Sequence, residues 1–373
     1  MQRSLFATTP YAWARLKSDG WAWVDSLPLR DWAAADAARL LACLSFSSEA
    51  WQRLEALGPS VGELYWPAVN ASVDIEPDQL LPCIRMLLAN DRPYVAMRLL
   101  HRALHIKQDV STGILTEALL AAISGAPDFA GVSAHEIGSL IETLQSRKDA
   151  DIDAVCKIEW EFLALLDRHQ RREPITLQRR IASDPAVFCH FVKLAFHSKD
   201  GQSDSHDDAD PVLRERVASN AYRLLSGWDV CPGVGEDGQV VGADFNAWLD
   251  HVKRECAESG RLAAAMSMLG KCLASAPADA DGLWLDRTVA NALNGRDADA
   301  MRKGMITDFF NSRGTYGFSG GAAELEISKR YDDRATAISE AGYARLAQDL
   351  RSLAQSYGLQ AERDQLRGPY GAQ

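Results

Sequence analysis

Residues 80–105 read LLPCIRMLLANDRPYVAMRLLHRALH, and this stretch decides the fold class. Its apolar residues recur at intervals of three and four, in 80–88 and again in 96–104, which is the period of an α-helix with one buried face. The break at 90–93 ends in Pro93, which a first helical turn tolerates because its missing N–H would have no intrahelical partner there. The stretch therefore predicts two helices joined by a tight turn.

The same period continues along the rest of the chain. Further apolar stripes lie at 114–122, 137–144, 155–166, 217–225, 245–256, 262–269 and 346–357. The breaks between most of them are short, which favours antiparallel helices stacked in chain order. No segment alternates at period two for long, and the best strand candidate, 239–241, is very short. We predict an all-α fold, an irregular array of helical hairpins of the TPR-like or HEAT-like α-solenoid type or a bundle, with almost no strand.

One internal echo supports a repeat. The pattern Arg-x3-Ala-Met-x2-Leu-x3-Leu begins at Arg92 and again at Arg261, position for position. Both copies follow a turn and lead into a helix with its apolar residues on one face, as in helical-pair solenoids. Two helices rich in Ala and Leu can also match by chance, and no strict period extends over the chain.

Composition limits the class of protein. At roughly 150 residues per domain, 373 residues predict two or three domains or one long array. A hydrophobic content of 47% excludes disorder throughout, and no apolar run approaches the length of a membrane span. The N-terminus has no secretory signal pattern, and the seven cysteines include no C-x-x-C pair, which favours reduced thiols. We expect a cytoplasmic protein without membrane contact, and its net charge of −11 argues against a nucleic-acid-coating protein.

Three regions follow from the pattern. Residues 1–198 form a Trp-rich helical array, with six of the ten tryptophans among the first 66 residues, where they are expected mainly in the core. Residues 199–210 are acidic and lack large apolar side chains, which predicts a linker. Residues 211–373 form a second helical array, interrupted by a loop at 311–323.

Local catalytic motifs are not found. Gly233, Gly235 and Gly238 satisfy G-x-G-x-x-G, but neither a strand before them nor a helix directly after them supports a dinucleotide site. His101 and His105 have a spacing that could place two imidazoles on a metal ion, yet no third ligand is nearby in the sequence. We find no nucleophile elbow or phosphate-binding loop. The sequence thus predicts no catalytic residue, no metal site and no cofactor.

One basic cluster is dense enough to bind phosphate. It consists of Arg168, Arg171 and Arg172, with Arg179 and Arg180 following. Acidic neighbours dilute the cluster and no aromatic residues alternate with it for base stacking. Nucleic-acid binding at 168–180 is therefore the less favoured reading, and a solvated face or a protein interface the more favoured one.

Several strings from Leu40 onward resemble signatures of a group of large, poorly characterised bacterial proteins, some linked with phage defence. The strings include Glu159-Trp160-x-Phe162-Leu163, Asp184-Pro185-x2-Phe188, Arg223-Leu224-Leu225-x2-Trp228, Asp279-Ala-Asp281-Gly282-x-Trp284, Asn311-Ser312-Arg313-Gly314 and Tyr343-x-Arg345-Leu346-Ala347. The resemblance is to a C-terminal α-helical repeat region that follows an N-terminal effector or nucleotide-binding domain. It implies an interaction or sensing module without catalytic residues.

Within these strings, Asn311, Ser312, Arg313 and Gly314 are the residues least explained by packing, because a polar tetrapeptide contributes little to a core. We expect this loop to be held against another helix or a ligand.

Two functional classes remain. The favoured one is a non-catalytic module that binds a protein partner, an effector domain of a larger assembly or a sensed ligand, and it predicts a surface groove lined with Arg, Trp and Tyr. The alternative is a nucleic-acid-binding or enzymatic effector whose site combines distant residues, such as His101, His105 and a carboxylate.

Overall fold

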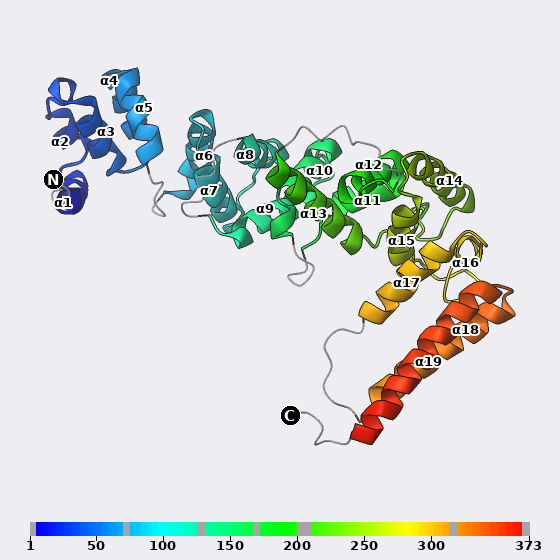
Figure 1. The fold of residues 1–373 in the computed structure, drawn as a ribbon. Helices are drawn as coiled ribbons and strands as arrows, with labels where there is room; N and C mark the ends of the chain where they lie inside the picture. The colour runs from blue at the N-terminus through cyan, green and yellow to red at the C-terminus, as the bar shows by residue number, and fades with distance from the viewer. Residues whose placement is uncertain are drawn as a thin grey trace. The chain divides into compact units, whose positions relative to one another are not determined.

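The structure is a computed structural model that describes residues 5–69, 75–124, 132–166, 172–199, 210–312 and 320–367. These residues form nineteen α-helices and three short 3-10 helices (Figure 1). They contain no β-strand, and Val234 and Val240 pair through a single isolated bridge. The all-α prediction is confirmed. None of the described helices has the length and apolar character needed to cross a membrane.

The chain divides into two compact units, residues 1–176 and 177–373. In the first unit the helices are α1 (Leu5–Asp19), α2 (Trp21–Asp25), α3 (Ala34–Ala42), α4 (Ser48–Leu57), α5 (Pro59–Ala68), α6 (Leu80–Ala89), α7 (Pro93–His105), α8 (Thr112–Ser124), α9 (Ala134–Gln145) and α10 (Ile152–Glu161), with 3-10 turns at Leu29–Asp31, Pro77–Gln79 and Leu163–Leu165. The division falls in the first turn of α11 (Ile175–Ser183). The second unit continues with α12 (Pro185–Ala195), α13 (Pro211–Gly227), α14 (Gly242–Glu258), α15 (Leu262–Leu273), α16 (Arg287–Leu293), α17 (Asp299–Asn311), α18 (Ala322–Glu340) and α19 (Ala344–Arg367).

This division differs from the three predicted regions. Residues 200–209, most of the acidic segment, lie outside the described residues. Helix α12, before that segment, packs against α13 and α14 after it, so residues 177–198 belong with the C-terminal array rather than with the N-terminal one.

Three helical hairpins share one turn. Asp91, Gly260 and Gly342 each take a positive φ, of 54°, 67° and 94°, and connect α6 to α7, α14 to α15 and α18 to α19. In each turn the next amide N–H donates to a carbonyl five residues earlier, at 2.8–3.0 Å. This hydrogen bond and the left-handed residue are the signature of a helix C-terminal Schellman turn. The predicted hairpin at 80–105 and the turns before Arg92 and Arg261 are thereby confirmed.

The two echoed arginines also act alike. Each is the residue before its helix begins, and each guanidinium donates to the carbonyl of an earlier segment of its own unit. Arg92 bonds the Trp66 carbonyl, and Arg261 bonds the Phe196 carbonyl at 2.6 Å. The echo therefore includes a side chain that ties the turn to the end of a preceding helix.

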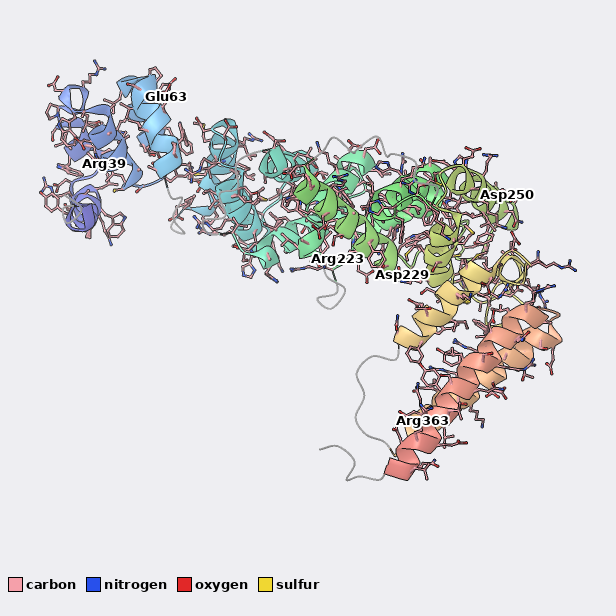
Figure 2. All side chains as sticks on the ribbon, in the orientation of Figure 1. Arg39, Glu63, Arg223, Asp229, Asp250 and Arg363 are labelled. Atoms are coloured by element: carbon pink, nitrogen blue, oxygen red, sulfur yellow. The ribbon has the colours of Figure 1, made fainter. Side chains whose placement is uncertain are left out.

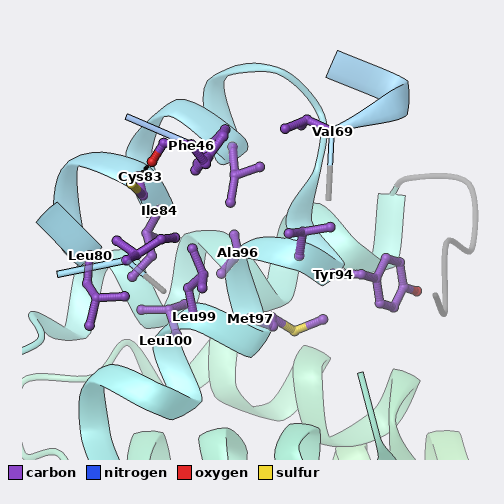
Figure 3. Close-up of a cluster of buried hydrophobic side chains, with 14 of the residues drawn as sticks. Phe46, Val69, Leu80, Cys83, Ile84, Tyr94, Ala96, Met97, Leu99 and Leu100 are labelled. Atoms are coloured by element: carbon purple, nitrogen blue, oxygen red, sulfur yellow. Dashed lines mark hydrogen bonds between the residues drawn. The ribbon is translucent and has the colours of Figure 1, made fainter. Parts of the chain in front are cut away.

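The core of the first unit is continuous through its hairpins. Figure 3 shows Leu80 and Ile84 of α6 beside Leu99 and Leu100 of α7, all four buried. The tryptophans of the first 66 residues are placed differently from the expectation, because none is fully buried: Trp13 and Trp32 are exposed, and the others pack at the edge of the core.

In the second unit, aromatic rings and a close helix contact form the core. The rings of Phe188, Trp228 and Trp248 lie 5.2–5.9 Å apart, and Trp228 is 2% exposed. Helices α15 and α17 pack so closely that a Cβ on Gly270 or on Gly304 would overlap the backbone of the facing helix. The glycines at 233–238 form a tight loop before α14, in which the Val241 amide donates to the Gly233 carbonyl at 2.8 Å.

Candidate functional site

The predicted loop residues lie partly outside the described structure. Asn311 is the exposed last residue of α17, and Ser312 follows it and donates its hydroxyl to the Phe309 carbonyl at 3.0 Å. Arg313 and Gly314 are not among the described residues, and neither are Arg168 and Arg171. The expectations for these four positions stay predictions.

Arg172 is described, and its position argues against a phosphate contact. It is 7% exposed, its Nε donates to Glu142 Oε1 at 3.1 Å, and one Nη lies 3.0 Å from His135 Nδ1. Its guanidinium fills the space where a Cβ of Gly138 would stand, 2.7 Å from Nη1. A guanidinium enclosed in this way holds α9 to the following chain and cannot face a ligand, so we remove Arg172 from the candidate site.

His101 lies near the carboxylate of Glu136, as the alternative functional class requires. That carboxylate, however, already accepts hydrogen bonds at the start of α9. His101 Nδ1 lies 3.9 Å from Glu136 Oε1, beyond hydrogen-bond distance. The other oxygen of Glu136 accepts from the Ser133 amide at 2.7 Å and hydroxyl at 2.8 Å, in a capping box that begins α9. Burial lowers the pKa of His101, and the nearby Glu136 opposes that shift.

His105, four residues along the same helix, is exposed. In the ranges that the structure describes, no cluster of three or more His, Cys, Asp and Glu side chains could hold a metal ion.

A groove in the second unit is lined by Arg and Trp, two of the three residue types predicted for the favoured class, and no Tyr is among its lining residues. We call it the Arg–Trp groove; its volume is about 760 Å³. Its lining residues come from one loop and from α18: Trp284, Ala323, Glu326, Ile327, Lys329, Arg330, Asp333, Arg334 and Ala337. A groove of this size can take a small ligand or several side chains of a partner.

Trp284 lies in a hydrogen-bonded loop between α15 and α16. Asp279 accepts hydrogen bonds from the amides of Asp281 at 3.2 Å and Arg287 at 2.9 Å, and Gly282 takes φ 91°. The Trp284 indole N–H then donates to the Arg334 carbonyl of α18 at 3.2 Å. The loop at 279–284 therefore positions the Trp284 ring against the turn of α18 that contains Arg334.

Arg334 is the central side chain of the groove. Its guanidinium carbon lies 4.8 Å from the ring centroid of Trp284, 5.6 Å from that of Phe309 and 5.8 Å from that of Tyr331. Aromatic faces attract a cation, and each such contact contributes about 0.5–2 kcal/mol according to how dry it is. The rings contact the guanidinium, and it makes no hydrogen bond to another residue in the described part of the chain.

Buried aromatic residues of α17, α18 and α19 pack beneath Arg334 and form the floor of the groove. Phe309 and Tyr331 rings lie 5.3 Å apart, and Tyr331 and Tyr357 stack at 6.1 Å. The Tyr331 hydroxyl donates to the Phe309 carbonyl at 3.4 Å. Helices α17, α18 and α19 are thus joined beneath the groove, so the groove floor lies on rigid elements.

The electrostatics of the groove are unbalanced. Burial lowers the pKa of Arg334, Tyr331 opposes this shift, and the neighbouring Arg330 adds to it. In the described part of the chain, neither Arg330 nor Arg334 has a carboxylate within ion-pair distance. A half-buried cation without an anion is costly in a stable protein, and such sites favour an anionic ligand.

Sequence reasoning missed most of this site. It quoted Trp284 inside a longer string and placed its site residues at 311–314, directly after Phe309. The available signal was the spacing of Arg330 and Arg334, which puts two cations on one face of a helix with an aromatic residue between them.

A second hollow of about 1020 Å³ lies in the first unit. Trp66, Arg92 and, in Figure 2, the labelled Glu63 of α5 are among its lining residues. Arg92 is already bonded to the Trp66 carbonyl, so this hollow offers no free cation of the kind found at Arg334.

In comparisons with known proteins, no family model matches the chain, and neither the curated proteins nor the solved structures give a match.

Proposed function

We propose that this chain is a non-catalytic α-helical interaction module that binds a protein partner, or an effector domain of a larger assembly, through the Arg–Trp groove. The observation that carries the proposal is the Arg334 guanidinium, which lies 4.8–5.8 Å from the centroids of three aromatic rings and has no carboxylate partner among the described residues. Aromatic and arginine side chains in a preformed recess are the typical energetic centre of a protein interface.

The setting of the module is also part of the proposal. The quoted strings, from Glu159 to Ala347, resemble a repeat region of bacterial proteins, some linked with phage defence, and we extend that setting to this chain. A cytoplasmic location fits the seven cysteines, because none of them forms a disulfide among the residues that the structure describes.

Site-specific photocrosslinking in the native host tests the proposal. A photoreactive amino acid at Lys329, an exposed position of the groove, is compared with one at Arg351, an exposed position of α19 outside it. We expect a defined crosslinked partner from position 329, lost when Arg334→Met is added, and none from position 351. Identical products from both positions, or none from either, would contradict the proposal.

The alternative class makes a different prediction. If His101 and Glu136 formed a reactive site, His101→Gln would abolish the host's defence against phage, which is the proposed setting. It would leave the crosslink at position 329 intact. We expect His101→Gln to change neither.

A further inference from the structure

The groove follows a single face of α18. Ala323, Ile327, Arg330, Arg334 and Ala337 are spaced by four, three, four and three residues, which is one stripe of an α-helix. The stripe runs over 15 residues, and its 14 steps of 1.5 Å make it about 21 Å long. The groove is thus linear and has the length of a helix of four turns.

Another face of α18 packs against α19. Tyr331, Ala335 and Ile338 are buried, and α18 runs along α19 as a long hairpin (Figure 1). The stripe itself is half-buried or exposed. In a stacked helical array, the open face of a hairpin is the position where another helix would lie.

The chemistry of the stripe defines its complement. Alanines at both ends allow another backbone to come close, Ile327 supplies apolar contact, and Arg330 and Arg334 are two cations four residues apart. On a partner helix, carboxylates at i and i+4 would face these cations, because that spacing places both on one face. The fixed fork of a guanidinium binds a carboxylate with two parallel hydrogen bonds.

The groove rim disfavours a polyanion. Glu326 and Asp333 lie in the same lining, and the chain carries a net charge of −11. A nucleic acid, with one charge per phosphate, would meet these carboxylates along its whole path. A helix with two acidic side chains among neutral ones can place its charges on the arginines alone.

We propose that the Arg–Trp groove receives an amphipathic α-helix of a partner protein, bound by two acidic side chains spaced i, i+4 that pair with Arg330 and Arg334. This assignment rests on the proposed function, since it names the kind of partner that the groove takes.

Peptide selection tests the assignment without knowledge of the partner. A displayed library of helical peptides of about 16 residues, long enough for the stripe, is panned against the full chain. We expect enrichment of Asp or Glu pairs at i, i+4 beside apolar residues. The selected peptides are then measured by fluorescence anisotropy on variants of the full chain.

The matched variants carry equal changes of charge. Arg330→Gln with Arg334→Gln is expected to weaken binding at least about tenfold, as for interface hot spots. The control, Arg351→Gln with Arg363→Gln, removes two exposed charges from α19, where Figure 2 labels Arg363, and is expected to leave binding within about twofold. Arg334→Lys, which keeps the charge but loses the planar fork, is expected to weaken binding by an intermediate amount.

No enriched peptide, enrichment without acidic pairs, or equal loss in both double variants would overturn the assignment. A crosslinked partner at position 329 together with peptides that lack acidic pairs would leave the proposed function standing and reject the helix assignment. Circular dichroism of every variant confirms that the helices are intact, and Arg334→Lys serves if the double variant does not fold.

Discussion

Gly270 of α15 and Gly304 of α17 face each other reciprocally: a Cβ on Gly270 would overlap the backbone of Met301, and a Cβ on Gly304 would overlap the backbone of Ser267. Each glycine therefore meets the residue three positions before the other. Two helices can approach this closely only where both lack a side chain, and neither backbone can move aside without displacing its helix.

Gly304→Ala should therefore destabilise the second unit by about 1–3 kcal/mol or more, as for an overpacked core. Urea unfolding followed by circular dichroism measures the change. The control is Gly358→Ala in α19. Its added Cβ would lie 3.6 Å from Ser328 Oγ of α18, which is an ordinary contact distance. That substitution should be neutral or stabilising, by up to about 1 kcal/mol. Equal behaviour of the two variants would refute the close contact.

Arg172→Ala should lower the free energy of unfolding by about 1–3 kcal/mol, because it removes the bonds to Glu142 and His135 and leaves a buried space beside Gly138. Arg179→Ala, at an exposed position of α11, should change it by less than about 0.5 kcal/mol. Urea unfolding of both variants checks the pair. A neutral Arg172→Ala would restore this residue as a surface candidate.

Arg334→Met should separate binding from stability. Methionine keeps an unbranched apolar stem over the rings, and the variant no longer carries a half-buried charge whose pKa burial lowers. The lost attraction to the rings and the removed cost of the half-buried charge oppose each other, so we expect only a small change in melting temperature together with loss of the crosslinked partner. A clear fall in melting temperature would make Arg334 a structural residue.

Asp25 should give the first unit a measurable dependence on acid. Arg53 Nε and Nη2 donate to its two oxygens at 2.7 and 2.6 Å, and these hydrogen bonds hold the pKa of Asp25 below its usual 3.8. The stabilisation is therefore present above pH 3.8 and is lost as the pH falls through the lowered folded-state pKa.

Solvent screening keeps this contribution below about 1 kcal/mol, since the Asp25 side chain is largely exposed. Asp25→Asn should lower the free energy of unfolding more at pH 6 than at pH 2, as measured by urea unfolding at both values. An equal effect at the two values would show that the ion pair contributes nothing.

The seven cysteines should divide into two groups by reactivity. Cys43 and Cys156 are partly accessible and the other five are buried. Burial also raises the pKa of Cys83 to about 12, which suppresses its thiolate. A thiol-reactive dye should therefore label about two cysteines in the native protein and all seven in denaturant, and mass spectrometry should assign the early labels to positions 43 and 156. Rapid labelling of Cys83 would contradict the packing of α6.

Helices and their turns could be read from the sequence because their causes are local. The hairpin at 80–105 follows from apolar spacing and from the residues between its stripes, and it is confirmed. The groove could not be read in the same way, because Trp284, Phe309 and Arg334 come from three segments that meet only in the folded unit. Arg172 was misjudged for a similar reason, since its environment is set by Gly138 on an earlier helix.

The shared turn at Asp91, Gly260 and Gly342 has a consequence for how the chain can change over generations. The turn of each hairpin is held by a hydrogen bond between residues five positions apart. A duplicated pair of helices therefore carries its own turn, and deleting a pair removes that turn with it. Lineages could lengthen or shorten such an array in whole hairpins, and the groove would keep its shape as long as residues 279–367 stayed together.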